Sequence, residues 1–205
     1  MRAWRRRGWR YFFLSDYQPR QGKVSVYFTL AMPPHTALTR LIPLILAAAL
    51  PSCRAASQGP PAPVRETTEC RVTRIVAGDT VHCAGTGSVR LIGIDSPERS
   101  QPPFAARSAA ALRALIPVGT VARLERDIEA RDRYGRALGY IWRGGELVNW
   151  RMVSDGYAVP LTYPPNVQYV DFFASAQRAA RDAGRGLWGD DGFACAPVEH
   201  RRGRC

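Results

Sequence analysis

The sequence predicts a β-barrel with helices, an α+β fold, in residues 70–189. Short β-branched and apolar runs between turn signals indicate five strands. Three later segments have alanine-rich or apolar residues at helical spacing. The predicted order is three strands, a helix, two strands and two helices, which fits a small five-stranded Greek-key barrel of OB type with three helices. Such barrels commonly present a face that binds oligonucleotides, although a fold alone does not justify a catalytic claim.

The first three strands are predicted between residues 70 and 94. Residues 70–76, CRVTRIV, form a β-branched run, and Ala77-Gly78-Asp79 is a turn signal. TVHCA at 80–84 is the second strand. SVRLIGI at 88–94 is the third, and its run of apolar residues predicts a buried central strand.

The remaining elements follow the third strand. Residues 104–116, FAARSAAALRALI, predict the first helix, and VARLERD at 121–127 and RALGYIWR at 136–143 predict the last two strands. A short helix is expected from Glu146 to Asp155, closed by Gly156. The last amphipathic helix is expected over residues 167–183, before GRGLWG.

The N-terminal third contains features of a processing signal. We expect residues 1–31 to be a mis-annotated extension, because they show no clear hydrophobic period and the pattern of a secretory signal begins only at Met32. The apolar run Leu41–Leu50 is shorter than the roughly 20 residues that span a bilayer, and it fits the core of a secretory signal. Residues 32–56 are therefore predicted to be a signal peptide or a lipoprotein signal.

Two readings of the cleavage site remain open. Leu50-Pro-Ser-Cys53 resembles a bacterial lipobox, in which Cys53 would be lipidated. Ordinary signal-peptidase cleavage near Ala55-Ala56 is the alternative. Both place the protein outside the cytoplasm: periplasmic, secreted or lipid-anchored to the cell envelope. Residues 57–69 follow as a Pro-rich linker.

The cysteines support export. Without Cys53, four of the five cysteines remain, and an even number in an exported chain suggests disulfides. Three pairings are possible in principle, and we favour the two local ones, Cys70 with Cys83 and Cys195 with Cys205 in a C-terminal tail, residues 190–205. Zinc is the competing hypothesis, but the sequence contains no Cys-x-x-Cys spacing.

The net charge of the chain is +12. A positive excess suits a polyanionic partner, because basic side chains displace counterions from phosphates. Residues 54–205 contain arginine and no lysine, and a GC-rich genome, which favours arginine codons over lysine codons, would give the same bias. The charge is therefore weak functional evidence by itself.

Four short motifs fall at the ends of predicted elements. They are Gly78-Asp79-Thr80, Arg90 to Glu98 (RLIGIDSPE), Asp132 to Arg136 (DRYGR) and Gly186-Leu187-Trp188. Each motif alone is an ordinary turn or helix start. Their order and spacing together favour a functional constellation.

The charged residues of these motifs suit phosphodiester hydrolysis. Asp79 and Asp95 offer the hard oxygen ligands that Ca²⁺ or Mg²⁺ prefers. Glu98 can orient or deprotonate a water molecule. Arg90 and Arg136 can clamp a phosphate and neutralise charge that develops in the transition state.

The strand period raises one difficulty. Arg90 and Asp95 are five residues apart, so a straight strand would place them on opposite faces. A bend or bulge near Gly93 would bring Asp95 to the face of Arg90.

Together the four motifs resemble the thermonuclease (staphylococcal nuclease-like) family over about residues 70–189. The resemblance implies an OB-type barrel with three helices that hydrolyses DNA and RNA with Ca²⁺. It implies calcium binding by Asp79, Asp95 and the backbone of Ser96, with Glu98 as the general base. It further implies phosphate binding by Arg90 and Arg136, and substrate contacts by Arg133, Tyr134 and Tyr163.

The chain departs from the family pattern at one position beside the ion. Ala77-Gly78-Asp79-Thr80 stands where the family usually has Asp-Gly-Asp-Thr, so a carboxylate near the ion is absent. We expect a monomeric, exported nuclease that acts on DNA, RNA or both. The alternatives are a barrel that binds nucleic acid or protein without cutting, and a disulfide-stabilised protein of the cell envelope.

Overall fold

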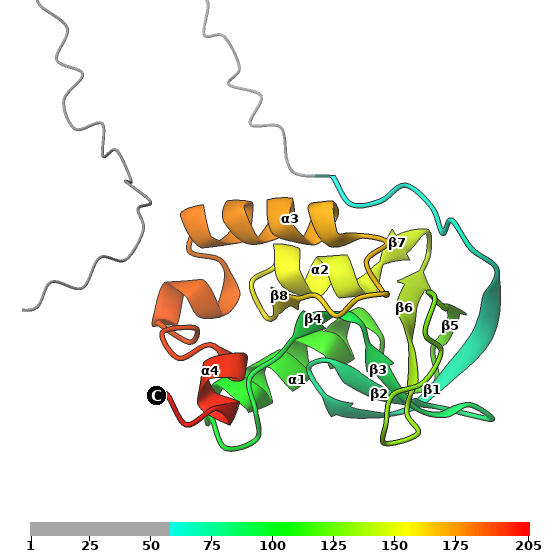
Figure 1. Ribbon diagram of the computed structural model, residues 1–205, viewed down its shortest axis with the longest axis horizontal. Coiled ribbons are helices and arrows are strands. Elements are labelled where there is room, and N and C mark those ends of the chain that lie inside the picture. Colours follow the sequence, from blue (N-terminus) through cyan, green and yellow to red (C-terminus); the bar gives the residue numbers. More distant parts are fainter. Residues whose placement is uncertain (1–57) are drawn as a thin grey trace, which may run out of the picture. The chain divides into compact units, whose positions relative to one another are not determined.

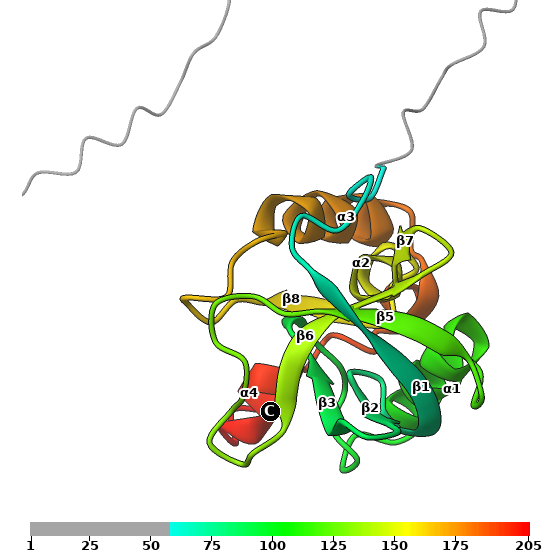
Figure 2. The same cartoon turned by 90° about the vertical axis from the view of Figure 1, so that its right-hand side faces the viewer.

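Five strands close into a barrel in the computed structural model, which describes residues 58–205 (Figure 1). Neighbouring strands pair in the order β3-β2-β1-β5-β6, and β3 pairs with β6 in parallel to close the ring. Figure 2 shows these strands around the barrel. The strands are β1 Thr67–Ala77, β2 Thr80–Cys83, β3 Gly87–Leu91, β5 Val121–Glu125 and β6 Ala137–Arg143. The predicted five-stranded barrel with helices is therefore confirmed.

Strand β1 is 11 residues long and pairs with two different strands of the barrel. Its first half, from Thr67 to Arg71, pairs with β5, and its second half pairs with β2. The register with β2 shifts between Val72 and Arg74, and such irregularities increase the bend of a strand. Inward-facing apolar side chains fill the interior, among them Val72, Val81, Val89, Leu124 and Ile141.

Three helices cover the barrel, α1 Phe104–Leu115, α2 Val148–Ser154 and α3 Val170–Asp182. Helix α3 is amphipathic and buries Phe173, Ala176 and Ala180. Figure 1 shows α3 lying along α2. One boundary was predicted wrongly: residues Glu146–Leu147 pair with β6 as a short strand, β7, so α2 begins only at Val148.

The third predicted strand, 88–94, is divided in two. β3 ends at Leu91, and a separate strand, β4 Gly93–Asp95, pairs with β8 Val159–Leu161 in a second small sheet. Gly93 makes the redirection possible: its φ is +79°, and a Cβ there would lie 2.3 Å from Cε2 of Phe173. The sequence did not indicate β8.

The C-terminal tail is folded rather than extended. A 3₁₀ helix, η1 Gly186–Asp190, is followed by a short helix, α4 Pro197–Arg201, which the sequence analysis did not predict. Cys195 and Cys205 form a disulfide around α4, and Cys70 and Cys83 form another. Their Cα atoms are 5.8 Å and 5.1 Å apart, within the limit of about 7 Å for bridging. These are the two local pairs favoured from the sequence.

The N-terminal expectations fall mostly outside this part of the chain. The predicted extension over 1–31, the signal segment over 32–56 and the lipidation site Cys53 all lie outside the described residues. The predicted linker, 57–69, was too long, because β1 already begins at Thr67. None of the helices formed by residues 58–205 has the length and apolar character of a membrane span.

Candidate active site

All nine residues that the sequence analysis assigned to metal, catalysis or substrate line one cavity of about 950 Å³. They come from the β1–β2 turn, from β3, from the end of β4 and the loop after it, from the loop before β6, and from the segment after β8. The barrel and the small β4–β8 sheet therefore bring together segments that are far apart in the sequence. The nine are Asp79, Arg90, Asp95, Ser96, Glu98, Arg133, Tyr134, Arg136 and Tyr163.

Asp79 is fixed by the turn between β1 and β2. Its carboxylate accepts hydrogen bonds from the hydroxyl of Thr80 at 2.8 Å and from the backbone N–H of Ser96 at 3.1 Å. The preceding residue must be glycine because α1 packs closely there: a Cβ on Gly78 would lie 1.8 Å from Oγ of Ser108. In the Gly-Asp-Thr motif, the packing therefore requires Gly78, and Thr80 orients the carboxylate of Asp79.

Arg90 lies between the two aspartates. Its Nη2 is 3.2 Å from Oδ2 of Asp79 and 3.3 Å from Oδ1 of Asp95. The break at Gly93 is the bend that the sequence analysis required, because it turns Asp95 to the face that Arg90 occupies. One guanidinium therefore faces both carboxylates.

Asn149, on α2, supports the backbone at that break. It is fully buried, its Oδ1 accepts from the backbone N–H of Ile141 at 2.9 Å, and its Nδ2 donates to the carbonyl of Ile92 at 2.9 Å. Ile92 is the residue between β3 and β4. This role of Asn149 was not predicted from the sequence, where the only signal was one amide in an apolar stretch.

Asp95 is 1% exposed and meets a second arginine that the sequence analysis also missed. Arg201, at the end of α4, donates from Nη2 to Oδ2 of Asp95 at 2.7 Å and from Nη1 to Oδ1 at 3.1 Å. Its Nη1 also contacts Oε1 of Glu98. Burial raises the pKa of Asp95 above that of an ordinary aspartate, although Arg201 and Arg90 both act to lower it.

Arg136 approaches the cavity from the loop before β6, where Asp132 holds it. Its Nε donates to Oδ2 of Asp132 at 2.7 Å, and the backbone N–H groups of Tyr134 and Arg136 donate to Oδ1 at 3.0 and 2.9 Å. Partial burial acts to raise the pKa of Asp132, but these hydrogen bonds outweigh it and hold that pKa below the ordinary value. Asp132 therefore organises the turn as an ionised carboxylate.

The outer part of the cavity is aromatic and basic. Tyr134 and Tyr163 are 69% and 66% exposed. Arg133 donates from Nη2 to the hydroxyl of Tyr134 at 2.8 Å, and its guanidinium carbon lies 4.9 Å from the centre of that ring. Exposed aromatic rings beside arginines are a surface on which nucleotides can stack.

The chemistry of the donors in the cavity fits a hard cation. Across residues 58–205, no group of three or more His, Cys, Asp or Glu side chains is arranged to hold a metal ion. Asp79 and Asp95 offer carboxylate oxygens, which suit Ca²⁺. In this arrangement those oxygens are paired with the guanidinium groups of Arg90 and Arg201.

Comparisons with known proteins cover most of this site. Residues 88–190 match the family described as staphylococcal nuclease homologue. The thermonuclease of Staphylococcus intermedius is 34% identical over 125 residues, which is 57% of this chain and 74% of that protein. The thermonuclease of Staphylococcus hyicus is 32% identical over 126 residues, 58% and 74% of the two chains. The SPbeta prophage-derived endonuclease YokF of Bacillus subtilis (strain 168) is 30% identical over 139 residues, which is 63% of this chain and 47% of that protein.

The family match contains eight of the nine predicted residues. Asp79 lies before its first residue, and Arg201 lies after its last. The residues that contact Asp95 therefore come partly from inside the matched segment and partly from the tail beyond it.

Proposed function

The chain belongs to the staphylococcal nuclease homologue family, and we propose that it is a calcium-dependent nuclease that hydrolyses phosphodiester bonds of DNA, RNA or both. The observation that carries this proposal is the cavity in which Arg90 contacts both buried aspartates, Asp79 and Asp95. Glu98 and Arg136 line the same cavity. Its relatives include proteins named thermonuclease and endonuclease.

In the proposed site, Asp79, Asp95 and the backbone carbonyl of Ser96 would hold the cation. These are oxygen donors: Asp95 ends β4, and the carboxylate of Asp79 is held by two hydrogen bonds. When bound, calcium would polarise a phosphate oxygen and position a water molecule.

The remaining charged residues would handle the phosphate and the proton. Glu98, 37% exposed at its side chain, is accessible enough to accept a proton from the attacking water. Arg90 and Arg136 would bind phosphate oxygens with planar, bidentate hydrogen bonds and stabilise the charge of the transition state. Tyr134, Tyr163 and Arg133 would hold the flanking nucleotides at the outer part of the cavity.

The proposal is tested by incubating the purified protein with DNA and with RNA, each in calcium and in excess EGTA. We expect cleavage in calcium and loss of cleavage in EGTA, restored when calcium is added back. Undiminished cleavage in EGTA would contradict calcium dependence. Binding of nucleic acid without cleavage under every metal tested would instead support the binding-module alternative.

We also propose that the protein acts outside the cytoplasm, either free or lipid-anchored at Cys53. The two disulfides support this location, because disulfides persist in oxidising compartments. Intact-mass measurement of the exported protein tests the proposal. The expected result is a mature chain that begins between Cys53 and Ser57 and gains the mass of four hydrogen atoms when the reductant converts its two disulfides to thiols. An acyl mass on Cys53 would identify the anchored form.

A further inference from the structure

Arg201 occupies the carboxylate oxygens that a cation would need. Its two Nη atoms bind both oxygens of Asp95, and one of them also contacts Glu98. A cation coordinated by Asp95 would need at least one of the same oxygens. It would also bring a double positive charge next to the guanidinium, and like charges repel at such distances. Arg201 and the cation therefore exclude one another at Asp95.

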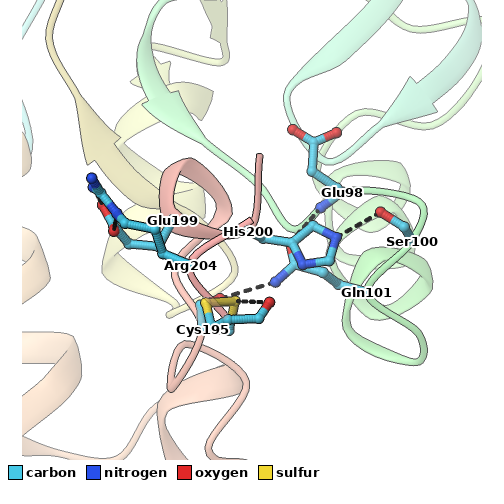
Figure 3. Close-up of a disulfide and its surroundings, with 8 residues drawn as sticks. Glu98, Ser100, Gln101, Cys195, Glu199, His200 and Arg204 are labelled. Atoms are coloured by element: carbon cyan, nitrogen blue, oxygen red, sulfur yellow. Dashed lines mark hydrogen bonds and ion pairs between the residues drawn. A yellow bond between two sulfur atoms is a disulfide. The ribbon is translucent and has the colours of Figure 1, made fainter. Parts of the chain in front are cut away.

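The tail that carries Arg201 is fastened to the same loop as the proposed general base. Gln101, 8% exposed, accepts from the backbone N–H of Glu98 at 2.9 Å and donates to the carbonyl of Cys195 at 2.9 Å. His200 Nε2 lies 2.8 Å from the hydroxyl of Ser100. Figure 3 shows these contacts beside the Cys195 disulfide.

The disulfide closes the segment on both sides of Arg201. Cys195 precedes α4 and Cys205 follows it, so the bond confines all of the residues between them. Confinement of this kind raises the effective concentration of a side chain at its target. The confined arginine meets a carboxylate that is almost fully buried, where a bidentate charged contact is strong.

We propose that Arg201 is a further residue of this site that sets its cation affinity, by competing with the cation for Asp95 and Glu98 while the Cys195–Cys205 disulfide holds it in place. This inference rests on the proposed function, because it requires a cation site at Asp95. It assigns a role to a segment beyond the matched family region, residues 88–190.

The size of the effect follows from the population of the docked tail. An internal competitor leaves only a fraction of the molecules able to bind the cation. The apparent dissociation constant is the intrinsic one divided by that fraction. If the tail is docked in about nine molecules out of ten, its removal strengthens calcium binding about tenfold.

The test is calorimetric titration of the purified full chain with calcium chloride, comparing wild type with Arg201→Ala and Arg202→Ala. Arg202 is the matched control, because it is the next residue, its loss changes the net charge equally, and its ion-pair partner is Glu199. We expect Arg201→Ala to bind calcium about tenfold more tightly than wild type, and Arg202→Ala to stay within about twofold. Equal dissociation constants for the two variants would overturn the proposal.

The tether is tested with the double variant Cys195→Ser/Cys205→Ser. We expect its calcium affinity to rise in the same direction as that of Arg201→Ala but by less, because the arginine remains and only its confinement is lost. An affinity identical to wild type would overturn the role of the disulfide.

These outcomes separate the two proposals. If wild type and Arg201→Ala bind calcium equally, the competition is refuted and the calcium-dependent nuclease stands. If neither binds calcium while EGTA leaves cleavage unchanged, the cation site itself is refuted, and the competition is refuted with it.

Discussion

The two most deeply buried carboxylates among residues 58–205 are partnered in opposite ways. Glu125, at the end of β5, is 0% exposed, and Asp95, at the end of β4, is 1% exposed. The exposed fraction of the two residues therefore does not distinguish them. Their hydrogen-bond partners distinguish them.

Glu125 is surrounded by neutral donors from the barrel, from the start of α3 and from the segment before β1. It accepts from the indole N–H of Trp142 at 2.7 Å and from the hydroxyl of Tyr169. The backbone N–H groups of Val64 and Arg65 donate to it at 3.0 and 2.9 Å, so the carboxylate also ties the segment before β1 to the barrel. Burial and, after it, the hydrogen bond to Glu125 raise the pKa of Tyr169, which keeps this hydroxyl a donor.

Asp95 is surrounded by charged groups at the edge of a cavity. Its partners are Arg90 in the barrel and Arg201 in the tail, and Asp79 adds a second carboxylate nearby. A buried acid whose hydrogen bonds all come from neutral donors is part of the scaffold. A buried acid satisfied by long cationic side chains can exchange them for another cation. The following predictions test this difference, in order of decreasing expected effect.

The largest effect is expected from Asp95→Asn. The amide keeps the shape of the side chain but removes the charge that a cation and both arginines need. We expect calcium binding to be lost and turnover to fall about 10³-fold, equivalent to about 4 kcal/mol of transition-state stabilisation. Calorimetry and a DNA cleavage assay measure the two losses. Asp182→Asn, at the exposed end of α3, is the control. Wild-type turnover in Asp95→Asn would remove the distinction between the two acids.

Arg90→Ala and Arg136→Ala are each expected to lower turnover about 10²–10³-fold, because each removes a charge-stabilising contact. Arg136→Lys should also be impaired, since lysine cannot form the planar fork. Steady-state kinetics on DNA measures these effects, with circular dichroism to establish folding. Arg113→Ala, on the exposed end of α1, serves as the neutral comparison. Near-normal turnover in either of the first two variants would count against a phosphate clamp.

Glu125→Gln should affect stability rather than binding. The amide turns a donor toward groups that are themselves donors, so at least one buried N–H or O–H loses its acceptor. We expect the free energy of unfolding in urea to fall by about 3 kcal/mol, while the calcium affinity of the folded protein is unchanged. Glu69→Gln, at an exposed position on β1, should change stability by less than about 0.5 kcal/mol. A weakened calcium affinity in Glu125→Gln would show that the two carboxylates are coupled.

The smallest effect is expected from Asp132→Ala. Arg136 would lose its ion-pair partner and the turn would lose its backbone hydrogen bonds, so the guanidinium would be less well positioned. We expect turnover to fall about tenfold. The double variant Asp132→Ala/Arg136→Ala should be no slower than Arg136→Ala, because Asp132 acts through that arginine. Additive losses in the double variant would exclude this positioning role.

The sequence predicted the barrel well because its signals are local. Strand runs such as CRVTRIV and turn signals such as Ala77-Gly78-Asp79 are short-range patterns, and they fall where the strands and the turn are observed. The resemblance to a family then supplied the candidate residues, and all nine line one cavity.

The features that were missed depend on contacts between distant segments. Asn149 looks like an ordinary helix residue until its three hydrogen bonds to β6 and to Ile92 are seen. Arg201 is one of several arginines in a short tail, and only the folded position of α4 brings it to Asp95, 106 residues away in sequence. Strand β8 is three residues long and forms by pairing with β4, so it has almost no pattern of its own.

The parallel pairing of β3 with β6 determines when the two phosphate-binding arginines come together during folding. It sets Arg90 opposite Leu138, two residues after Arg136, so the spacing of the two arginines is fixed by the seam of the barrel. The seam joins segments far apart in the chain, and such contacts carry a large loop-closure entropy and form slowly. A chain with a correctly formed β1–β2–β3 meander but an open seam would present one arginine without the other. We therefore expect nuclease activity to return on refolding only with barrel closure, with no partially active stage before it.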